Sequence, residues 1–251
     1  MNISKLSVLK HCLAVATILG ALSMSIVPAA AEGNPNPGVA PPNSTSHGMT
    51  YGEWAAQWWS WVFEAPVDAN PLLDTTGEHC AQGQSGSVWF LAGASWGSPV
   101  SRDCEIPADK ALFFPLENYA YISWSTDPYT WTPEEEAFWR GVLADGIDTY
   151  GGGLVAEIDG VPLVNLDDYR VQSPVFYSWV PDDNYIDFTS GTCRGHGPPR
   201  PCSDWQEGDL SGPHVDDGTY LLLMPLSPGE HTLHFAGWNG AVDVTYNLTV
   251  E

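Results

Sequence analysis

Basic residues are scarce in this sequence. The 251 residues include 8 Lys and Arg against 31 Asp and Glu, which gives a formal net charge of −23. A surface of this sign repels phosphate backbones and anionic lipid headgroups. We therefore expect no nucleic-acid partner. The acidity has two ordinary explanations, solubility in a salty or calcium-containing medium and simple surface chemistry, and one functional explanation, cation binding.

Long apolar runs are also lacking. The run from Cys12 to Val27 is short for a membrane anchor, follows Lys5 and Lys10, and precedes three alanines that resemble a signal-peptidase site. We predict a signal peptide over residues 1–31, a secreted or periplasmic protein, and no transmembrane anchor. Cleavage would remove two lysines and no acid, which leaves 6 basic against 31 acidic residues and a net charge of −25.

The sequence has no pair of C-x-x-C motifs, which argues against a structural zinc site. Four cysteines follow the predicted leader, and an even number in an exported chain is typical of disulfides, with three possible connectivities. We favour the two bonds that each close a short ring around a loop-like stretch. These are Cys80 with Cys104 and Cys193 with Cys202.

Composition divides the predicted mature chain into two parts. Residues 32–49 are rich in Pro, Gly, Asn and Ser, bury little apolar surface and are expected to form a flexible arm. No second linker of this kind interrupts residues 50–251, which we expect to fold as a single domain of the β-sandwich type.

Aromatic residues are abundant in the stretch "MTYGEWAAQWWSWVFEAP". Thr50 and Glu53 have the spacing of a capping box, which predicts a helix from Tyr51 to Glu64 that ends before Pro66. Helical rotation places six side chains in an arc of about 120°, the width of a core-facing stripe. They are Tyr51, Trp54, Ala55, Trp58, Trp61 and Val62. Trp59 and Phe63 lie on the flank of this stripe, where a ligand could contact them.

A second helix is predicted in "WTPEEEAFWRGVLADGIDTYGGG". Thr132 is the expected N-cap, Pro133 the first helical residue and Glu135 the partner in a capping box, while glycines follow the end. Its apolar face is expected to consist of Phe138, Trp139, Val142 and Leu143.

The rest of the chain alternates strand-like runs with turns. Examples are "SVWFLAG", "KALFFPLENYAYISW", "GLVAEIDG", "DYRVQSPVFYSW", "GTYLLLMPL" and "AVDVTYNLTVE". Pro115 should limit how centrally its strand can pair. "PLSPGEHTLHF" indicates two strands joined by a Ser-Pro-Gly-Glu turn. The pattern predicts a mainly β protein, an antiparallel β-sandwich or jelly roll with two α-helices packed outside.

Several of these stretches together resemble a group of uncharacterised secreted bacterial proteins. The resemblance rests on the tryptophan-rich N-terminal helix, "GQSGSVWFLAG", "ALFFPLEN", "YRVQSP" and the apparent hairpin in "DGTYLLLMPLSPGEHTL". It covers most of the predicted mature chain and implies export and a single domain. It implies no activity, cofactor or catalytic residue.

No complete catalytic signature is present. "GASWG", residues 93–97, matches G-x-S-x-G, but the helix that should follow a nucleophile Ser95 is replaced by a loop-like sequence. Glu117 follows the apolar run "ALFFPL", and apolar walls would disfavour its charged form, as a general acid requires. The alternative is a glutamate at a strand end that faces water.

Clusters of carboxylates suggest calcium as a possible cofactor. Hard cations prefer several oxygen ligands at once, and the first candidates share one loop, Asp182, Asp183 and Asp187. Asp216 and Asp217 form a second cluster in "GPHVDDG", also interpreted as a loop, as is the segment holding His214. Neither cluster has the spacing of an EF-hand loop, and such turns also occur without metal.

Aromatic residues in loop-like segments are candidates for a sugar-binding platform, because sugar rings stack their C–H faces on such side chains. The candidates are Trp124, Tyr129, Trp131, Trp179 and Tyr185. The alternative is packing beneath long loops. Three hypotheses for function remain open: an acidic binding or surface-associated domain, with carbohydrate and calcium as ligands; a polysaccharide hydrolase that uses carboxylates such as Glu117; and a structural envelope protein.

The acidic excess predicts that salt stabilises the fold, because screening weakens repulsion between like charges. The melting temperature of the mature protein should rise as sodium chloride is increased from low to high concentration, as followed by circular dichroism. A melting temperature that stays flat over this range would contradict the prediction.

Overall fold

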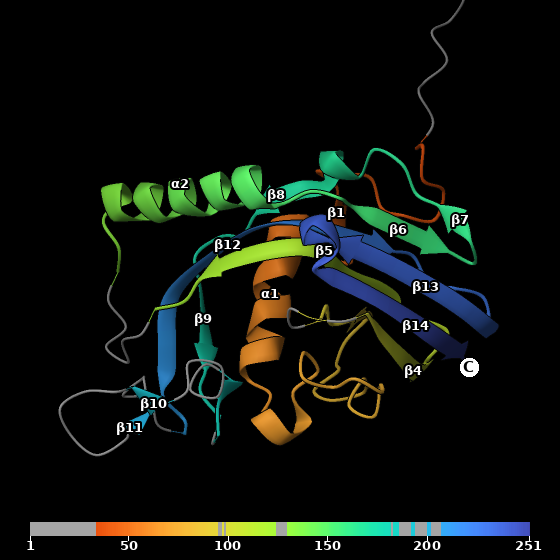
Figure 1. Ribbon diagram of the computed structural model, residues 1–251, viewed down its shortest axis with the longest axis horizontal. Helices are drawn as coiled ribbons and strands as arrows, with labels where there is room; N and C mark the ends of the chain where they lie inside the picture. The colour runs from red at the N-terminus through yellow and green to blue at the C-terminus, as the bar shows by residue number, and fades with distance from the viewer. Residues whose placement is uncertain are drawn as a thin grey trace, which may run out of the picture. The chain divides into compact units, whose positions relative to one another are not determined.

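Two five-stranded sheets and two α-helices make up most of the structure, which is a computed structural model (Figure 1). It describes residues 34–94, 97, 99–123, 130–181, 183–185, 192–193, 200–201 and 207–251. The predicted leader therefore lies outside the described residues. Residues Asn34–Glu251 form one compact unit. No helix among the described residues has both the length and the apolar character needed to cross a membrane.

The first sheet has the order β3-β5-β12-β8, and β9 also pairs with β12. Its strands are β3 (Val88–Phe90), β5 (Ala111–Tyr121), β12 (Leu210–Leu223), β8 (Arg170–Gln172) and β9 (Phe176–Trp179). The second sheet has the order β4-β14-β13-β6-β7. It contains β4 (Val100–Ile106), β14 (Val242–Val250), β13 (Gly229–Gly237), β6 (Val155–Ile158) and β7 (Val161–Pro162).

Shorter elements complete the described part of the chain. Two small antiparallel ladders pair β1 (Thr45–Ser46) with β2 (Met49–Thr50) and β10 (Thr192–Cys193) with β11 (Arg200–Pro201). Three 3-10 helices are η1 (Val67–Ala69), η2 (Leu166–Tyr169) and η3 (Trp238–Gly240).

The predicted mainly β, sandwich-like architecture is confirmed. The two large sheets meet through their aromatic residues, as in the pair Phe114 and Phe235, whose ring centroids lie 4.9 Å apart. Period-two burial along β14 matches the predicted pattern, with its five apolar residues turned to the core. Pairing is mostly antiparallel, but β3–β5 and β14–β4 are parallel.

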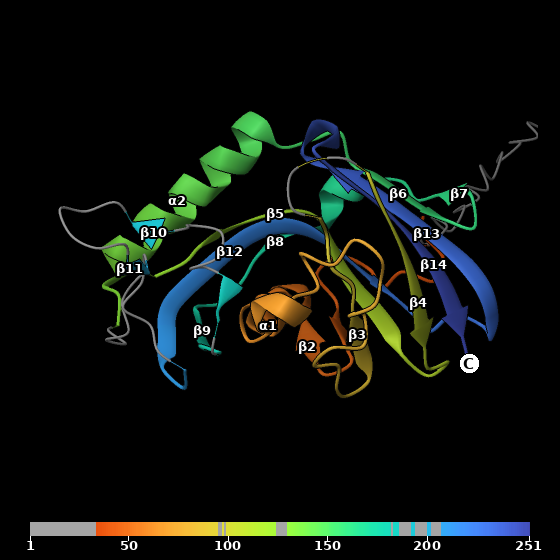
Figure 2. The same cartoon turned by 60° about the horizontal axis from the view of Figure 1, so that its bottom comes forward.

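The two helices pack on opposite faces of the β5–β12 pair. Successive residues of a strand point to opposite sides, so Asp216 of β12 bonds Trp59 in helix α1 (Tyr51–Phe63), whereas Val215 packs with Leu143 in α2 (Pro133–Tyr150). Figure 2 shows α1 beneath the curved strands and α2 above them. Helix α1 is therefore part of the core rather than an outer layer.

Helix α1 begins and packs as its sequence predicts. The capping box between Thr50 and Glu53 is present, and the helix ends at Phe63 with Glu64 as its C-cap. Of the predicted core-facing stripe, Trp54 is partly buried and the other five side chains are buried. The tryptophans of this stripe are therefore mainly core residues.

Helix α2 has the predicted caps but a narrower buried face. Leu143 and Ile147 are buried and Trp139 is partly buried, whereas Phe138 and Val142 are 61% and 37% exposed. The prediction that Phe138 and Val142 face the core is wrong. The reason is geometric, since α2 touches the sheet along one side of β5 and β12 and turns these two side chains away.

Among the described residues, strand β5 has partners on both sides only as far as Phe113. It lies between β3 and β12, and the β5–β12 register shifts at Thr219 and Tyr220, so that Tyr220 pairs with Pro115 and Thr219 with Glu117. In the described part of the chain, β5 is paired beyond Phe113 with β12 alone, so Pro115 lies where the strand has a single neighbour, as its sequence predicts.

Strand β12 is longer than its sequence suggests. It begins at Leu210, so His214, Asp216 and Asp217 lie in a strand rather than in loops, and all three are buried. The following Ser-Pro-Gly-Glu segment does not close a hairpin, because β12 and β13 belong to different sheets. The turn-forming residues of this segment instead connect β12 in the first sheet to β13 in the second sheet.

The segment expected to be a flexible arm is attached from Asn34 onward. Asn36 is buried and exchanges hydrogen bonds with the backbone of Val164, while the Ala40 amide donates to Leu222 O at 2.8 Å. Val39 forms a bridge with Leu223. These contacts order a segment whose composition alone resembles a linker.

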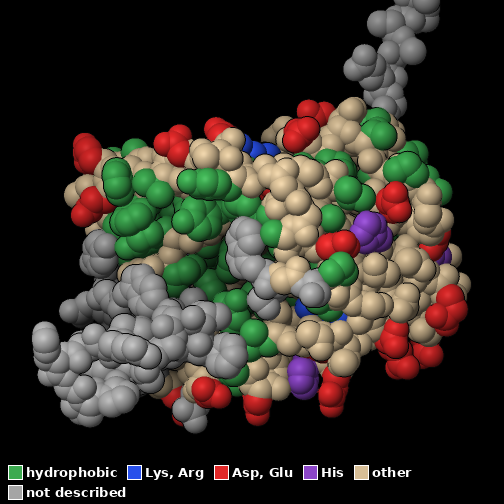
Figure 3. Space-filling model, viewed as in Figure 1, with side chains coloured by type: hydrophobic (Ala, Val, Ile, Leu, Met, Phe, Trp, Pro, Cys, Tyr) green, Lys and Arg blue, Asp and Glu red, His purple; other side chains and the backbone are tan. Residues whose placement is uncertain are grey.

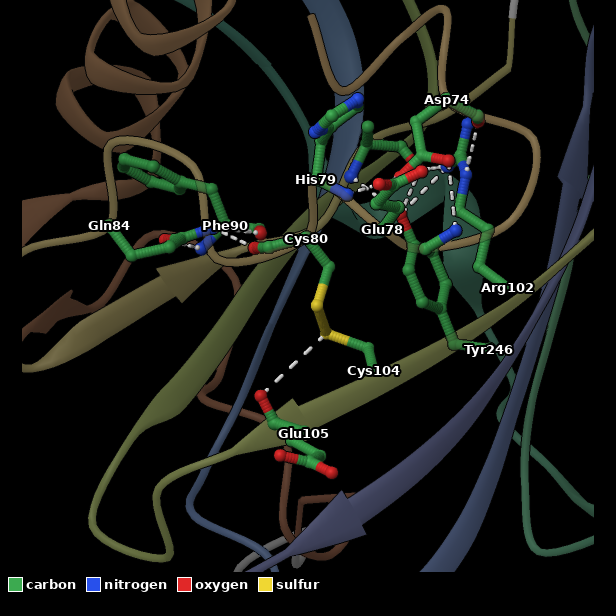
Figure 4. Close-up of a disulfide and its surroundings, with 12 residues drawn as sticks. Asp74, Glu78, His79, Cys80, Gln84, Phe90, Arg102, Cys104, Glu105 and Tyr246 are labelled. Atoms are coloured by element: carbon green, nitrogen blue, oxygen red, sulfur yellow. Dashed lines mark hydrogen bonds between the residues drawn. A yellow bond between two sulfur atoms is a disulfide. The ribbon is translucent and has the colours of Figure 1, made fainter. Parts of the chain in front are cut away.

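The disulfide between Cys80 and Cys104 is present, as predicted, and ties a loop to β4 (Figure 4). Beside it, the buried Arg102 donates to the carbonyls of Asp74, Ala92 and Gly93 and to the Tyr246 hydroxyl. The second predicted bond is untested, because only the backbone of Cys193, in β10, is described and Cys202 lies outside the described residues.

His214 is buried between aromatic rings, with Phe63 and Phe176 at centroid distances of 5.9 and 5.2 Å. The Ser123 amide donates to its Nδ1 at 3.1 Å. Burial lowers the pKa of His214 to about 4, since the surrounding apolar groups disfavour the charged imidazolium.

Acid should therefore weaken the fold through His214. The folded pKa of about 4 lies below the unfolded value of 6.5, so the unfolded chain binds the proton first. This contribution is complete above pH 6.5 and is lost as the pH falls toward 4, by about 3 kcal/mol in total. The His214→Gln variant should show a shallower loss of unfolding free energy over this range in urea titrations. Equal slopes for both proteins would contradict the assignment.

Candidate functional site

A cavity of about 280 Å³ lies along the edge of β5. Strand β3 pairs with β5 only as far as Phe113, so that beyond this residue the edge has no strand partner in the described part of the chain. The space beside it is lined by α1, the residues after β3, and the turn between β13 and β14. Its main lining side chains are Trp59, Phe63, Glu117, Tyr119, Tyr185 and Trp238.

Aromatic rings form both walls of this cavity. On the α1 side, Trp59 and Phe63 stack with ring centroids 5.1 Å apart. On the opposite side, Tyr119 and Trp238 form an edge-to-face pair at 6.2 Å. The space-filling view shows hydrophobic side chains gathered along α2 and around the hollow beside it (Figure 3). The predicted position of Trp59 and Phe63 on the ligand-accessible flank of α1 agrees with this arrangement.

A hydrogen-bond chain fixes the orientation of Trp59. Its Nε1–H donates to Asp216 Oδ1 at 2.7 Å, and the Tyr220 hydroxyl donates to Asp216 Oδ2 at 2.9 Å. Asn118, which also lines the cavity, donates to the Tyr220 hydroxyl. Burial raises the pKa of Asp216, and the two donated hydrogen bonds oppose this shift. Asp216 therefore positions an aromatic wall and does not line the cavity itself.

Glu117 places a carboxylate in the cavity. The residue is 5% exposed, and its Oε2 accepts hydrogen bonds from the backbone amides of Gly152 at 2.7 Å and Trp238 at 3.4 Å. Its Oε1 accepts none from the described residues. The hypothesis that Glu117 faces water at a strand end is therefore wrong, and the expected apolar surroundings are present.

Glycines make room for this carboxylate. A Cβ atom at Gly151 would lie 2.8 and 3.0 Å from the two Glu117 oxygens, and Gly152, the amide donor, has φ +106°, which favours glycine. A Cβ at Gly237 would lie 2.1 Å from Leu116 O. From the sequence, the "GGG" after α2 is interpreted only as a helix end. These glycines also indicate a close approach of the backbone to a side chain, which is Glu117.

A second hollow of about 520 Å³ adjoins the first and shares Tyr119 and Trp238 with it. Its other walls come from α2, where Val142 and Tyr150 are exposed. Helix α2 approaches closely at Gly146, because a Cβ there would lie 2.8 Å from the Tyr119 ring. The apolar surface therefore continues from the cavity onto α2.

The structure describes three of the five predicted platform residues, and these three do not share one surface. Tyr185 lines the cavity and burial raises the pKa of its hydroxyl, whereas Trp179 is 57% exposed and lies outside the cavity. Trp131 is buried against Leu143 and Val215, so its role as an exposed platform residue is wrong. Trp124 and Tyr129 lie outside the described residues.

The predicted calcium ligands remain largely untested. Asp183 is exposed, and both Asp182 and Asp187 lie outside the described residues, as does Ser95. Asp217 is buried in an ion pair with Arg170 at 2.7 Å, so it is not a free cation ligand. Within the described ranges, no three His, Cys, Asp or Glu side chains gather in a way that could hold a metal.

Comparison with known proteins yields no matching family model, no matching curated protein and no matching solved structure.

Substitution at Gly151 should disturb the Glu117 carboxylate. The new methyl group of Gly151→Ala would also lie 2.6 Å from Ile147 O, and we expect unfolding free energy to fall by about 1–3 kcal/mol. The matched control is Gly141→Ala in α2, where nothing lies within 4 Å of the new Cβ, and which should stabilise by up to about 1 kcal/mol. Urea unfolding measures both. A Gly151→Ala protein as stable as the wild type would contradict the crowding.

Proposed function

We propose that this protein is an exported carbohydrate-binding protein whose ligand occupies the cavity around Glu117. The observation that carries this proposal is the meeting of aromatic walls with one buried carboxylate. Sugar rings stack their apolar C–H faces on aromatic side chains, and their hydroxyls donate hydrogen bonds to carboxylates. The volume of about 280 Å³ suits a small ligand such as one sugar ring.

Binding is favoured over cleavage by the number of acids in the cavity. Glycoside hydrolysis ordinarily needs two carboxylates that flank the scissile bond. Among the described residues that line the cavity, Glu117 is the one acid. Asp216 is already engaged by Trp59 and Tyr220.

Export is part of the proposal. The Cys80–Cys104 disulfide supports it, since such bonds persist in the periplasm and outside the cell. The predicted signal peptide over residues 1–31 and the acidic character of the remaining chain are consistent with the same location. Calcium assistance through Asp182, Asp183 and Asp187 stays a prediction.

Filling the cavity should abolish binding without unfolding the protein. Ala120 lines the cavity and pairs with Asp216, which faces Trp59, so its side chain shares that face. In Ala120→Leu the added carbons occupy ligand space, and affinity should fall by about 10-fold or more. The control is Ala137→Leu on the exposed side of α2, outside the cavity.

The assay is isothermal titration with neutral and amino monosaccharides and soluble oligosaccharides, with calcium and with chelator, together with measurement of released reducing sugar. Binding that Ala120→Leu weakens and Ala137→Leu preserves supports the proposal. If no saccharide binds, or if Ala120→Leu binds as the wild type does, the proposal fails. Release of sugar would favour the hydrolase hypothesis instead.

A further inference from the structure

Among the side chains that the structure describes, the Glu117 carboxylate has no cationic partner. Its two hydrogen bonds both come from neutral backbone amides to Oε2, and none of the ion pairs between described side chains includes it. Burying a carboxylate is unfavourable unless its charge is paired as well as hydrogen-bonded. The cavity therefore offers a carboxylate oxygen, Oε1, whose negative charge is not balanced by any described side chain.

Four basic residues have described side chains, and all four are engaged elsewhere. Lys110 lies beside Asp109, and Arg140 pairs with Glu136 at 2.8 Å. Arg170 pairs with Asp148 and Asp217, and Arg102 is surrounded by carbonyls and the Tyr246 hydroxyl. With 8 basic against 31 acidic residues, the chain has few alternatives. A balancing charge is most readily supplied by the ligand.

The walls of the cavity suit a cation as well. The faces of tryptophan and tyrosine rings carry negative electrostatic potential and attract ammonium groups, most strongly where water is excluded. Trp59, Tyr119, Tyr185 and Trp238 all line the space around Glu117. The net charge of −23 also attracts cations to the surface in general and speeds their encounter with the site.

We infer that the ligand is an amino sugar with a free, protonated amine. The inference rests on the proposed carbohydrate binding and adds the identity of the group that Glu117 recognises. The ammonium donates to Glu117 Oε1 and balances its charge, while the sugar ring stacks between the aromatic walls. A neutral sugar would satisfy the hydrogen bond but leave the charge unpaired, and an N-acetylated sugar would add bulk beside the carboxylate without charge.

The test compares ligands that differ at one carbon, using the wild-type protein. D-glucosamine, N-acetyl-D-glucosamine and D-glucose carry an ammonium, an acetamide and a hydroxyl at the same position in mildly acidic buffer, and the galacto series gives a second set. We expect the amine to bind at least about 10-fold more tightly than its two analogues, as charge-assisted hydrogen bonds imply. Choline serves as a cation without a sugar ring.

Each outcome separates the inference from the function on which it rests. Equal affinity for the three sugars overturns the amino-sugar inference and leaves carbohydrate binding intact. Binding of choline without any sugar overturns both, because charge alone would then be recognised. Absence of binding by every probe also overturns both.

A variant tests the role of Glu117 itself. Glu117→Gln should reduce affinity for the amino sugar by at least about 10-fold and remove its preference over the hydroxyl analogue. Glu134→Gln, at an exposed site in the first turn of α2, makes the same change in net charge and should leave the preference unchanged. A preference that survives in Glu117→Gln overturns the inference. Circular dichroism and the melting temperature verify folding, and the wild-type comparison stands without the variant.

Discussion

The pairing of β5 with β12 is the constraint on which the rest of the structure depends. These strands have 11 and 14 residues, and alternate side chains serve different layers, α1 on one face and α2 with the second sheet on the other. Strand β3 has only 3 residues, so β5 extends beyond its partner. An unpaired strand edge needs cover. Trp59 from α1 and Trp238 from the turn after β13 cover this edge from opposite sides, and the space between them is the cavity.

The same geometry explains why a carboxylate is tolerated at this edge. Glu117 lies where β5 passes the end of α2 and the end of β13, and the amides of Gly152 and Trp238 both point to its Oε2. Two connections therefore converge on one side chain. The glycines after α2 contribute through their lack of a Cβ, which lets backbone approach the carboxylate. The chemistry of the site is thus set by the packing of backbone segments as much as by its side chains.

Local signals in the sequence predicted the local structure well. Both capping boxes, the buried stripe of α1, the alternation in β14 and the Cys80–Cys104 bond depend on nearby residues, and all are confirmed. Features that depend on distant partners were not predictable. "GPHVDDG" has the composition of a turn, yet Asp216 and His214 lie in a strand because Trp59 and the Ser123 amide supply their hydrogen bonds. Glu117 was found as a candidate from its apolar neighbours, but its partners after α2 and β13 were not.

Two buried carboxylates, Asp216 and Glu117, differ in how many of their oxygens already accept hydrogen bonds from the protein. Asp216 accepts a hydrogen bond on each carboxylate oxygen, from Trp59 and from Tyr220. These bonds orient Trp59, which forms one wall of the cavity. Glu117 receives backbone amides on a single oxygen, so the other oxygen is left for a ligand. Aromatic walls alone would accept many flat apolar molecules, because stacking is weakly selective. We therefore propose that selectivity rests on Glu117, because a ligand that brings a positive charge to it gains the pairing that the described side chains do not provide.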